Sequence, residues 1–176
     1  MNTSKTNILI LIFGLLITTN AFACICTVKK LSDLQKSEFE NSEHIFIGEV
    51  FQINKTDLTF KIKVTESLTG GDEIGKIYTG KNWKYCYPII SEKGKWLIYG
   101  NLENGFLRLN MCGISRSFNY PVIHPLPPPL PELNENKMTE NDLEKISEKE
   151  QTENMKIAFS ELELEIVALR KRRSEK

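Results

Sequence analysis

Two cysteines, Cys24 and Cys26, stand where an exported chain would begin after removal of a signal peptide. Residues 1–23 fit such a peptide, because they carry a positive charge at Lys5, an almost unbroken apolar run and a small-residue cleavage pattern that ends at Ala23. Cleavage after Ala23 would give Cys24 a free α-amino group beside its own carbonyl. Disulfides from the two cysteines can hold this chain end rigidly.

A lipid anchor on Cys24 is the main alternative, because bacterial lipoproteins also begin at a cysteine that follows a signal peptide. Their cleavage site usually has leucine three residues before the cysteine and a small residue next, where this chain has Ala21 and Phe22. Lipidation would also leave three thiols, an odd number that cannot all pair in disulfides within the chain. No later segment is long and apolar enough to span a bilayer. The sequence therefore predicts a secreted protein, extracellular or periplasmic, and makes a lipid-anchored protein the less favoured alternative.

All four cysteines lie after the predicted cleavage site, at Cys24, Cys26, Cys86 and Cys112. An even count in an exported chain predicts two disulfides. Three pairings are open, and a bridge between Cys24 and Cys26 is disfavoured because its ring would be strained. Each of these two cysteines is then expected to reach a distant partner. Each cross-link should stabilise the fold by about 4 kcal/mol, less any strain.

The charges balance, with 23 basic and 23 acidic residues, so we expect no nucleic-acid partner. The two histidines, His44 and His124, lie far apart in the sequence, and no paired-carboxylate or nucleophile motif occurs, so we expect neither an enzyme nor a cofactor. Zinc binding or redox chemistry by the cysteines is an alternative that their spacing and the oxidising compartment disfavour. An aromatic ligand surface is another alternative, formed by Trp83, Tyr85 and Tyr87.

Residues 24–120 alternate short apolar segments with turn residues, as a β domain does. In the clearest strand, residues 58–66, every second residue is apolar, and Asn104-Gly105 is a typical hairpin turn. Further strands are expected at 45–53, 74–79, 95–99 and 106–111, after a short helix over 31–39. Five short strands with irregular connections predict a mainly β fold, a small Greek-key barrel of the OB type.

Two further segments follow the β domain. Residues 121–136 contain six of the seven prolines and should form an extended, semi-rigid linker. Residues 137–176 lack proline and glycine and are rich in Glu, Lys and Leu, which predicts a charged amphipathic helix. Its apolar residues follow a heptad spacing at Met155, Phe159, Leu162, Ile166 and Leu169. The seam is barely two heptads long, so the helix can dimerise weakly, dock a partner or pack back on the barrel.

This order of elements resembles the N-terminal, netrin-like domain of the tissue inhibitors of metalloproteinases. The matching features are the Cys-x-Cys terminus, an alternating strand, a cysteine after a strand and loop, and the closing strands, which are Cys24-Ile25-Cys26, 60–64, Lys84-Tyr85-Cys86, 96–100 and 105–112. The resemblance covers about residues 24–118 and implies a five-stranded OB-like barrel. It also implies the disulfides Cys24–Cys86 and Cys26–Cys112.

The resemblance further implies a mechanism. In the family, the α-amino nitrogen and carbonyl oxygen of the first cysteine chelate the catalytic zinc of a metalloendopeptidase and displace its water. Cys24 would fill that role here, toward a metal that belongs to the target, and Ile25 would enter the primary specificity pocket. The remaining protease contacts would be Cys26, Thr27, Val28, Lys84 and Tyr85. The alternative function is a non-inhibitory binding or adhesion module that assembles through the C-terminal helix.

Overall fold

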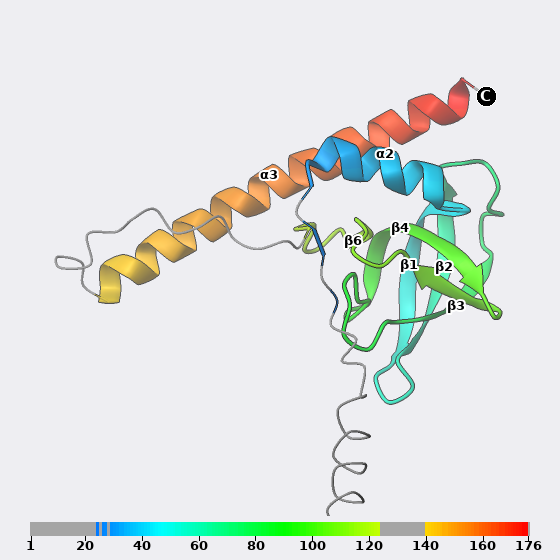
Figure 1. Cartoon of the computed structure of the whole chain (residues 1–176), viewed down its shortest axis with the longest axis horizontal. Helices are drawn as coiled ribbons and strands as arrows, with labels where there is room; N and C mark the ends of the chain where they lie inside the picture. The colour runs from blue at the N-terminus through cyan, green and yellow to red at the C-terminus, as the bar shows by residue number, and fades with distance from the viewer. Residues whose placement is uncertain (1–23, 25, 28, 124–139, 176) are drawn as a thin grey trace, which may run out of the picture.

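The computed structural model describes residues 24, 26–27, 29–123 and 140–175 (Figure 1). Within these described residues the elements are two helices and six strands. In chain order they are α2 (Leu31–Asn41), β1 (His44–Asn54), β2 (Thr59–Ser67), β3 (Ile77–Lys81), β4 (Gly94–Glu103), β5 (Phe106–Leu109), β6 (Arg116–Ser117) and α3 (Glu140–Ser174).

Five strands close into a barrel in the order β1-β2-β3-β5-β4, and the pairing of β1 with β4 completes the ring. All neighbours are antiparallel except β3 and β5, which run parallel where Gly80 faces Leu107. The two-residue strand β6 adds to the edge of β4. The predicted five-stranded OB-like barrel, with a short helix before it and a long helix after it, is confirmed.

Strands β1, β2 and β5 lie within two residues of their predicted bounds, whereas β4 runs on to Glu103, four residues beyond its predicted end at residue 99. β2 alternates buried and exposed residues along its length, as predicted. The hairpin between β4 and β5 turns at Asn104 and Gly105, which both have positive φ, as a type I′ turn requires. β3 begins at Ile77 rather than at the predicted residue 74, because residues 74–76 belong to the turn that leads into it. β6 was not predicted, since two polar residues give no strand pattern.

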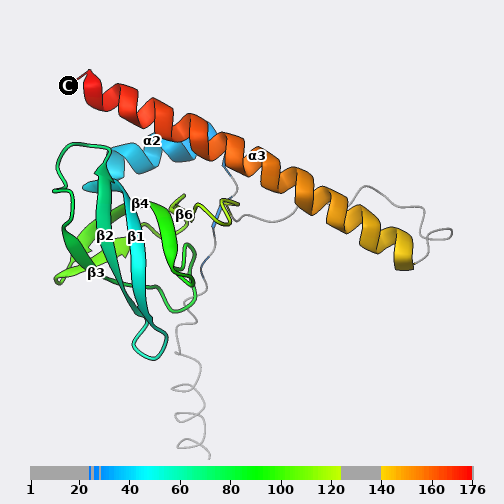
Figure 2. The ribbon, with the colours of Figure 1, turned by 180° about the vertical axis from the view of Figure 1, so that it is seen from behind.

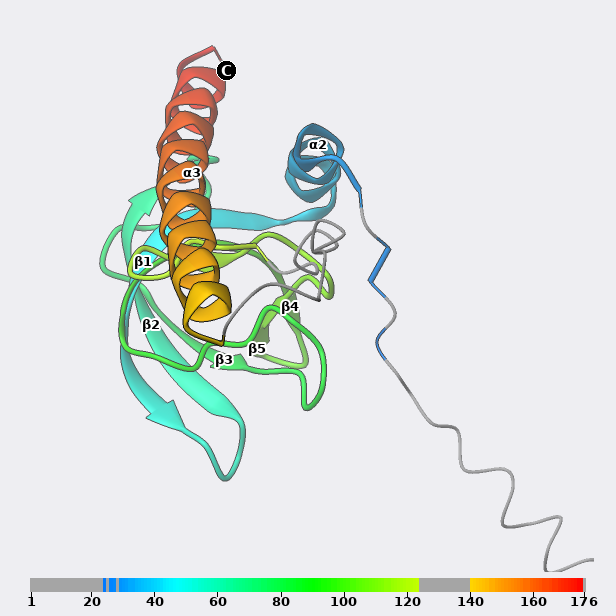
Figure 3. The same cartoon turned by 90° about the vertical axis from the view of Figure 1, so that its left-hand side faces the viewer.

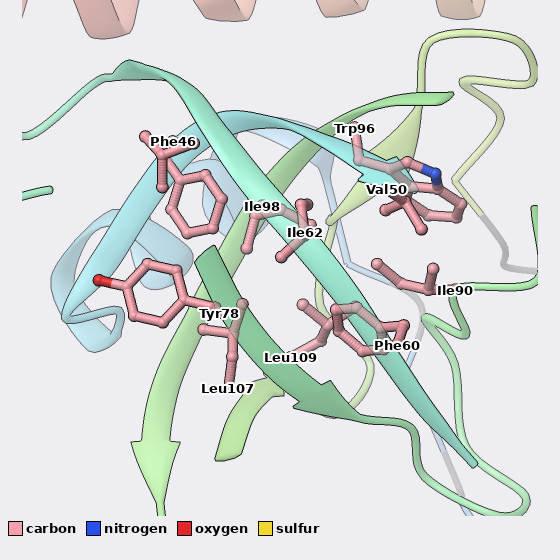
Figure 4. Packing of buried hydrophobic residues seen from close by; sticks show 11 residues of the cluster. Phe46, Val50, Phe60, Ile62, Tyr78, Ile90, Trp96, Ile98, Leu107 and Leu109 are labelled. Carbon is pink, nitrogen blue, oxygen red and sulfur yellow. The ribbon is translucent and has the colours of Figure 1, made fainter. Parts of the chain in front are cut away.

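The barrel interior is filled by large apolar side chains from all five strands, including Phe46, Phe60, Ile62, Tyr78, Trp96 and Leu107 (Figure 4). Gly80 makes room for one of them, because a Cβ there would lie only 2.0 Å from the ring of Phe60. A second cluster lies outside the barrel wall and includes Ile45, Ile47, Leu97 and Tyr99. Strands β1 and β4 therefore have buried residues on both faces.

Helix α3 supplies the cover for this second cluster. Leu162, Ile166 and Leu169 pack against the outer wall of the barrel, and α2 runs beside them (Figures 2 and 3). Phe159 is 41 % exposed and Met155 is half-buried, so the predicted heptad seam does not act as one face. Of the three outcomes that the sequence left open, this structure shows the helix packed back on the barrel. Among the described residues, no helix is long and apolar enough to cross a membrane.

Candidate functional site

Disulfides fasten the N-terminal end of the described chain to two loops. Cys24 is bonded to Cys86 and Cys26 to Cys112, with Cα–Cα distances of 5.6 and 5.4 Å, in the usual range. This is the pairing that the resemblance implies. It leaves none of the four cysteines free, so they serve neither as zinc ligands nor as reactive thiols. Two disulfides also indicate that the chain belongs in an oxidising compartment.

The two loops that receive the disulfides form one surface, here called the cysteine ridge and made of residues 84–87 and 111–112. The backbone N–H of Cys112 donates a hydrogen bond of 2.8 Å to the carbonyl oxygen of Tyr87, which ties the loops together. Met111 packs against the first disulfide, with its Sδ 3.7 Å from Cys24 Sγ. Both ends of the Cys24–Cys26 segment are therefore anchored on the same surface.

Large side chains on the cysteine ridge face solvent. The exposed fractions are 70 % for Tyr85, 53 % for Tyr87 and 48 % for Met111. The Lys84 ammonium lies 5.0 Å from the centre of the Tyr85 ring. The hydrogen bond with Tyr85 and the charge interaction between the two side chains raise the pKa of Lys84. Exposed apolar groups rimmed by charge are typical of surfaces that bind another protein.

Polar contacts beneath the ridge hold the first of these loops in place. The side-chain amide of Asn82 makes two hydrogen bonds of 2.9 Å with the backbone of Ile90, so it spans the loop from one end to the other. Trp83 donates to the carbonyl oxygen of Leu109 at 2.8 Å, and the Arg108 guanidinium stacks 4.7 Å from its ring. Trp83 is thus a packing residue, whereas Tyr85 and Tyr87 are exposed.

Helix α2 supports the second loop through Asn110. The Asn110 amide donates to Glu38 Oε2 at 3.1 Å and to Ser42 Oγ at 2.8 Å. Glu38 is buried, and loss of hydration raises its pKa to about 7, while the hydrogen bond from Asn110 opposes the shift and the nearby Glu165 adds to it. Asn110, which precedes Met111, is therefore held by hydrogen bonds to Glu38 of α2 and to Ser42 directly after it.

The structure brings together four of the predicted contact residues, since the bonds Cys24–Cys86 and Cys26–Cys112 hold Cys24 and Cys26 on the ridge that contains Lys84 and Tyr85. Thr27 is exposed on the same N-terminal segment. Ile25 and Val28, also predicted contacts, lie outside the described residues, as does the predicted cleavage site. Met111 was missed as a member of this surface, and Tyr87 was expected only in the alternative aromatic ligand surface and not as a protease contact. Their positions directly before Cys112 and after Cys86 were the available signal.

A buried polar cluster at His44 is a separate feature. His44 Nδ1 and the Tyr78 hydroxyl each lie 2.7 Å from Asp72 Oδ1, and burial followed by the hydrogen bond to Asp72 raises the pKa of Tyr78. The cluster fixes the loop after β2 to the first residue of β1. Within the described ranges, no group of three or more His, Cys, Asp or Glu side chains is placed to hold a metal ion.

No protein-family model matches the chain, and no curated protein matches it in sequence. The groups that the cysteine ridge offers to a partner are the ammonium of Lys84 and the exposed side chains of Tyr85, Tyr87 and Met111.

Proposed function

We propose that the mature chain, cleaved after Ala23, is a secreted inhibitor of zinc metalloendopeptidases. The free amine and the carbonyl oxygen of Cys24 would chelate the catalytic zinc of the target and displace its water. The observation that carries this proposal is the attachment of both Cys24 and Cys26 to one exposed ridge. The cysteine pattern resembles that of the tissue inhibitors of metalloproteinases, which supports the same conclusion.

The disulfides make chelation energetically reasonable. A flexible chain end would lose conformational freedom when it entered an active-site cleft, and that loss weakens binding. Cys24 and Cys26 are held by bonds to Cys86 and Cys112, so most of that freedom is already removed before binding. Ile25, the residue between them, would then be offered to the primary specificity pocket of the protease. Its larger apolar side chain, where the family usually has Thr or Ser, favours proteases with a hydrophobic pocket.

The remainder of the cysteine ridge would complete the contact. Tyr85, Tyr87 and Met111 provide exposed apolar area beside the disulfides, and Lys84 adds a positive charge. Thr27 and Val28 would extend the contact along the N-terminal segment. Aromatic residues are enriched among those that carry binding energy at protein interfaces, so Tyr85 and Tyr87 should supply most of the affinity that the ridge adds to zinc chelation.

Chelation requires the neutral form of the amine, because only that form has a lone pair to donate. A terminal amine has a pKa of about 7.7–8.0, so its neutral form is accessible near neutral pH. Zinc binding would lower this pKa further, since the metal competes with the proton.

The proposal is tested with the mature chain starting at Cys24 and a panel of zinc metalloendopeptidases, assayed with a peptide substrate. Inhibition of at least one of them, competitive with substrate, is the expected result. A serine protease assayed in parallel should be unaffected. Absence of inhibition across enzymes with small, medium and large hydrophobic specificity pockets would contradict the proposal.

A second candidate function is a non-inhibitory binding or adhesion module that assembles through α3. The observation that favours it is an outer apolar face on this helix, where Ile157, Leu164 and Val167 are 51 %, 68 % and 60 % exposed. Phe159 flanks the buried side of the helix and is also partly exposed. This function needs neither cleavage at Ala23 nor the Cys24 amine, which separates it from the first.

A further inference from the structure

A cavity of about 390 Å³ opens beside the cysteine ridge, between the loop before β4 and the chain that follows β5. Tyr87 and Cys112 belong to both the ridge and the cavity wall, and Trp96 lies at the start of β4. Small-molecule sites in proteins have volumes of roughly 300–1,000 Å³, so the cavity is large enough for a small ligand. Neither the barrel core nor the proposed inhibitory contact requires such a space.

The walls of the cavity are mostly apolar and aromatic. Tyr87, Trp96 and Tyr120 contribute rings, and Pro88, Ile89 and Val122 contribute aliphatic surface. The polar groups at its base are already paired. Trp96 Nε1 donates to the carbonyl oxygen of Glu92 at 3.2 Å, and the Ser115 hydroxyl bonds both the N–H and the carbonyl of Tyr99. A ligand body that fills this part of the cavity should therefore be apolar.

Glu92 gives the cavity a single formal charge. Among the residues that line it there is no lysine, arginine or histidine. The Ser117 hydroxyl donates to Glu92 Oε1, and Ser117 Oγ in turn accepts from the backbone N–H of Asn119 at 3.0 Å. These bonds orient the carboxylate, and its other oxygen can accept a hydrogen bond from a ligand. An anion in this cavity would face an unfavourable charge, whereas a cation would be neutralised.

We propose that this cavity binds a small amphipathic cation, an aromatic or aliphatic body that carries a primary ammonium group. The body lies among the rings of Tyr87, Trp96 and Tyr120, and the ammonium pairs with Glu92. The three rings also favour a cation, because the face of an aromatic ring is electron-rich. A charge-assisted hydrogen bond in a partly desolvated site is stronger than a neutral one, so the ammonium should decide the affinity.

The test uses the full mature chain and three probes of similar size, 2-phenylethylamine, 2-phenylethanol and 3-phenylpropionate, with binding measured by calorimetry at pH 7. The amine is expected to bind at least tenfold more tightly than the alcohol, and the acid least of all. Equal affinity for the amine and the acid, or no binding of the amine at millimolar concentration, would overturn the proposal.

Substitutions inside and outside the cavity test whether the amine binds there. Glu92→Gln keeps the shape and the bond from Ser117 but removes the charge, so it should lower the affinity for the amine to that for the alcohol. Glu73→Gln removes an equivalent charge from the exposed loop between β2 and β3, and it should leave the affinity for the amine unchanged. Val122→Phe fills the cavity and should abolish binding, with an unchanged circular dichroism spectrum as proof of folding. Retained tenfold selectivity in Glu92→Gln would refute the assignment of the charge.

The two tryptophans of the chain offer a direct readout of position. Trp96 lines the cavity, whereas Trp83 does not. In a ¹H–¹⁵N spectrum, titration with 2-phenylethylamine should move the indole N–H signal of Trp96 and leave that of Trp83 in place. Movement of Trp83 alone would place the ligand elsewhere. This test involves neither a protease nor the Cys24 amine, so its result is independent of the inhibitory function.

Discussion

Arg116 Nη2 lies 2.6 Å from Glu165 Oε2, and the two side chains are only 2 % and 3 % exposed. This buried ion pair joins the barrel to α3. The same carboxylate accepts hydrogen bonds from the Tyr99 hydroxyl at 2.5 Å and from the Gln35 amide at 2.9 Å. Glu165 therefore connects β4, β6 and both helices at one point.

Removal of one partner of this pair should be costly, because it leaves the other charge buried without compensation. Glu165→Leu is expected to lower the free energy of unfolding by about 3–5 kcal/mol. Glu163→Leu, at an exposed position two residues earlier on the same helix, should change it by less than about 0.5 kcal/mol. Urea unfolding followed by circular dichroism measures both. Similar losses in the two variants would show that the buried pair does not anchor the helix.

The pair itself need not be a net source of stability. Arg116 Nε and Nη1 are buried and have no hydrogen-bond partner within the described residues. Replacing both charges with apolar groups is often neutral or stabilising in such cases. Arg116→Met combined with Glu165→Leu should therefore recover most of the stability that Glu165→Leu loses. A double variant less stable than Glu165→Leu would contradict this.

Glu38 should make stability depend on pH. Burial raises its pKa from 4.5 to about 7, so the folded chain holds this proton more tightly than the unfolded chain. Its favourable contribution is complete below pH 4.5 and is lost as the pH rises through about 7. The loss should be of the order of 3 kcal/mol, because each tenfold difference in proton affinity between the two states corresponds to about 1.36 kcal/mol.

Glu38→Gln removes the titration but keeps an oxygen that can accept from Asn110. The variant should match the parent near pH 5 and exceed it in stability at pH 8, whereas Glu40→Gln, an exposed neighbour on α2, should behave like the parent. Unfolding midpoints in urea at the two pH values provide the measurement. An identical loss between pH 5 and pH 8 in Glu38→Gln and the parent would exclude Glu38 as the cause.

The disulfide between Cys24 and Cys86 should have two effects, to stabilise the fold and to hold the terminus in place for inhibition. It closes a sequence separation of 62 residues, so its removal in Cys24→Ser/Cys86→Ser should cost about 4 kcal/mol on the chain-entropy estimate. That variant keeps a free terminal amine but loses the tether. We expect it to inhibit the same protease at least tenfold more weakly at a temperature where it is folded. Undiminished inhibition would mean that preorganisation of the terminus is unimportant.

The second candidate function makes its own prediction about α3. If the outer face mediates assembly, sedimentation velocity should show a concentration-dependent dimer, and Leu164→Glu should abolish it by placing a charge in the apolar contact. Lys156→Gln, a substitution at an exposed position on the same helix, should leave the dimer intact. A chain that stays monomeric at a concentration of several hundred micromolar would remove this candidate.

The barrel was predictable because its strands carry local signals. The alternation of Phe60, Ile62 and Val64 and the Asn104-Gly105 turn depend only on neighbouring residues, and the structure contains both as expected. The buried ion pair was not predictable in this way. Arg116 and Glu165 are charged residues 49 positions apart, and no local pattern marks either as buried.

In α3, too, the sequence pattern did not show which charged residue would be buried. Glu165 falls three residues after Leu162 and four before Leu169, so its spacing places it on the apolar face, but its charge argued for the solvent side. The cysteine pattern indicated where the N-terminal segment attaches. It could not reveal that Met111 would join Tyr85 and Tyr87 on the exposed surface, or that a cavity with Glu92 in its wall would lie next to it. These features arise from contacts between distant loops.

Chelation by Cys24 is tested most directly by adding a single alanine before it in the mature protein. The extension leaves the disulfides, the barrel and α3 unchanged but converts the amine into an amide, which cannot ligate zinc. The inhibition constants of the two proteins are compared against the same metalloendopeptidase, with unfolding midpoints as the control for folding. We predict a loss of at least a hundredfold on extension at equal stability. Equal inhibition by the extended protein would contradict the zinc-chelation mechanism.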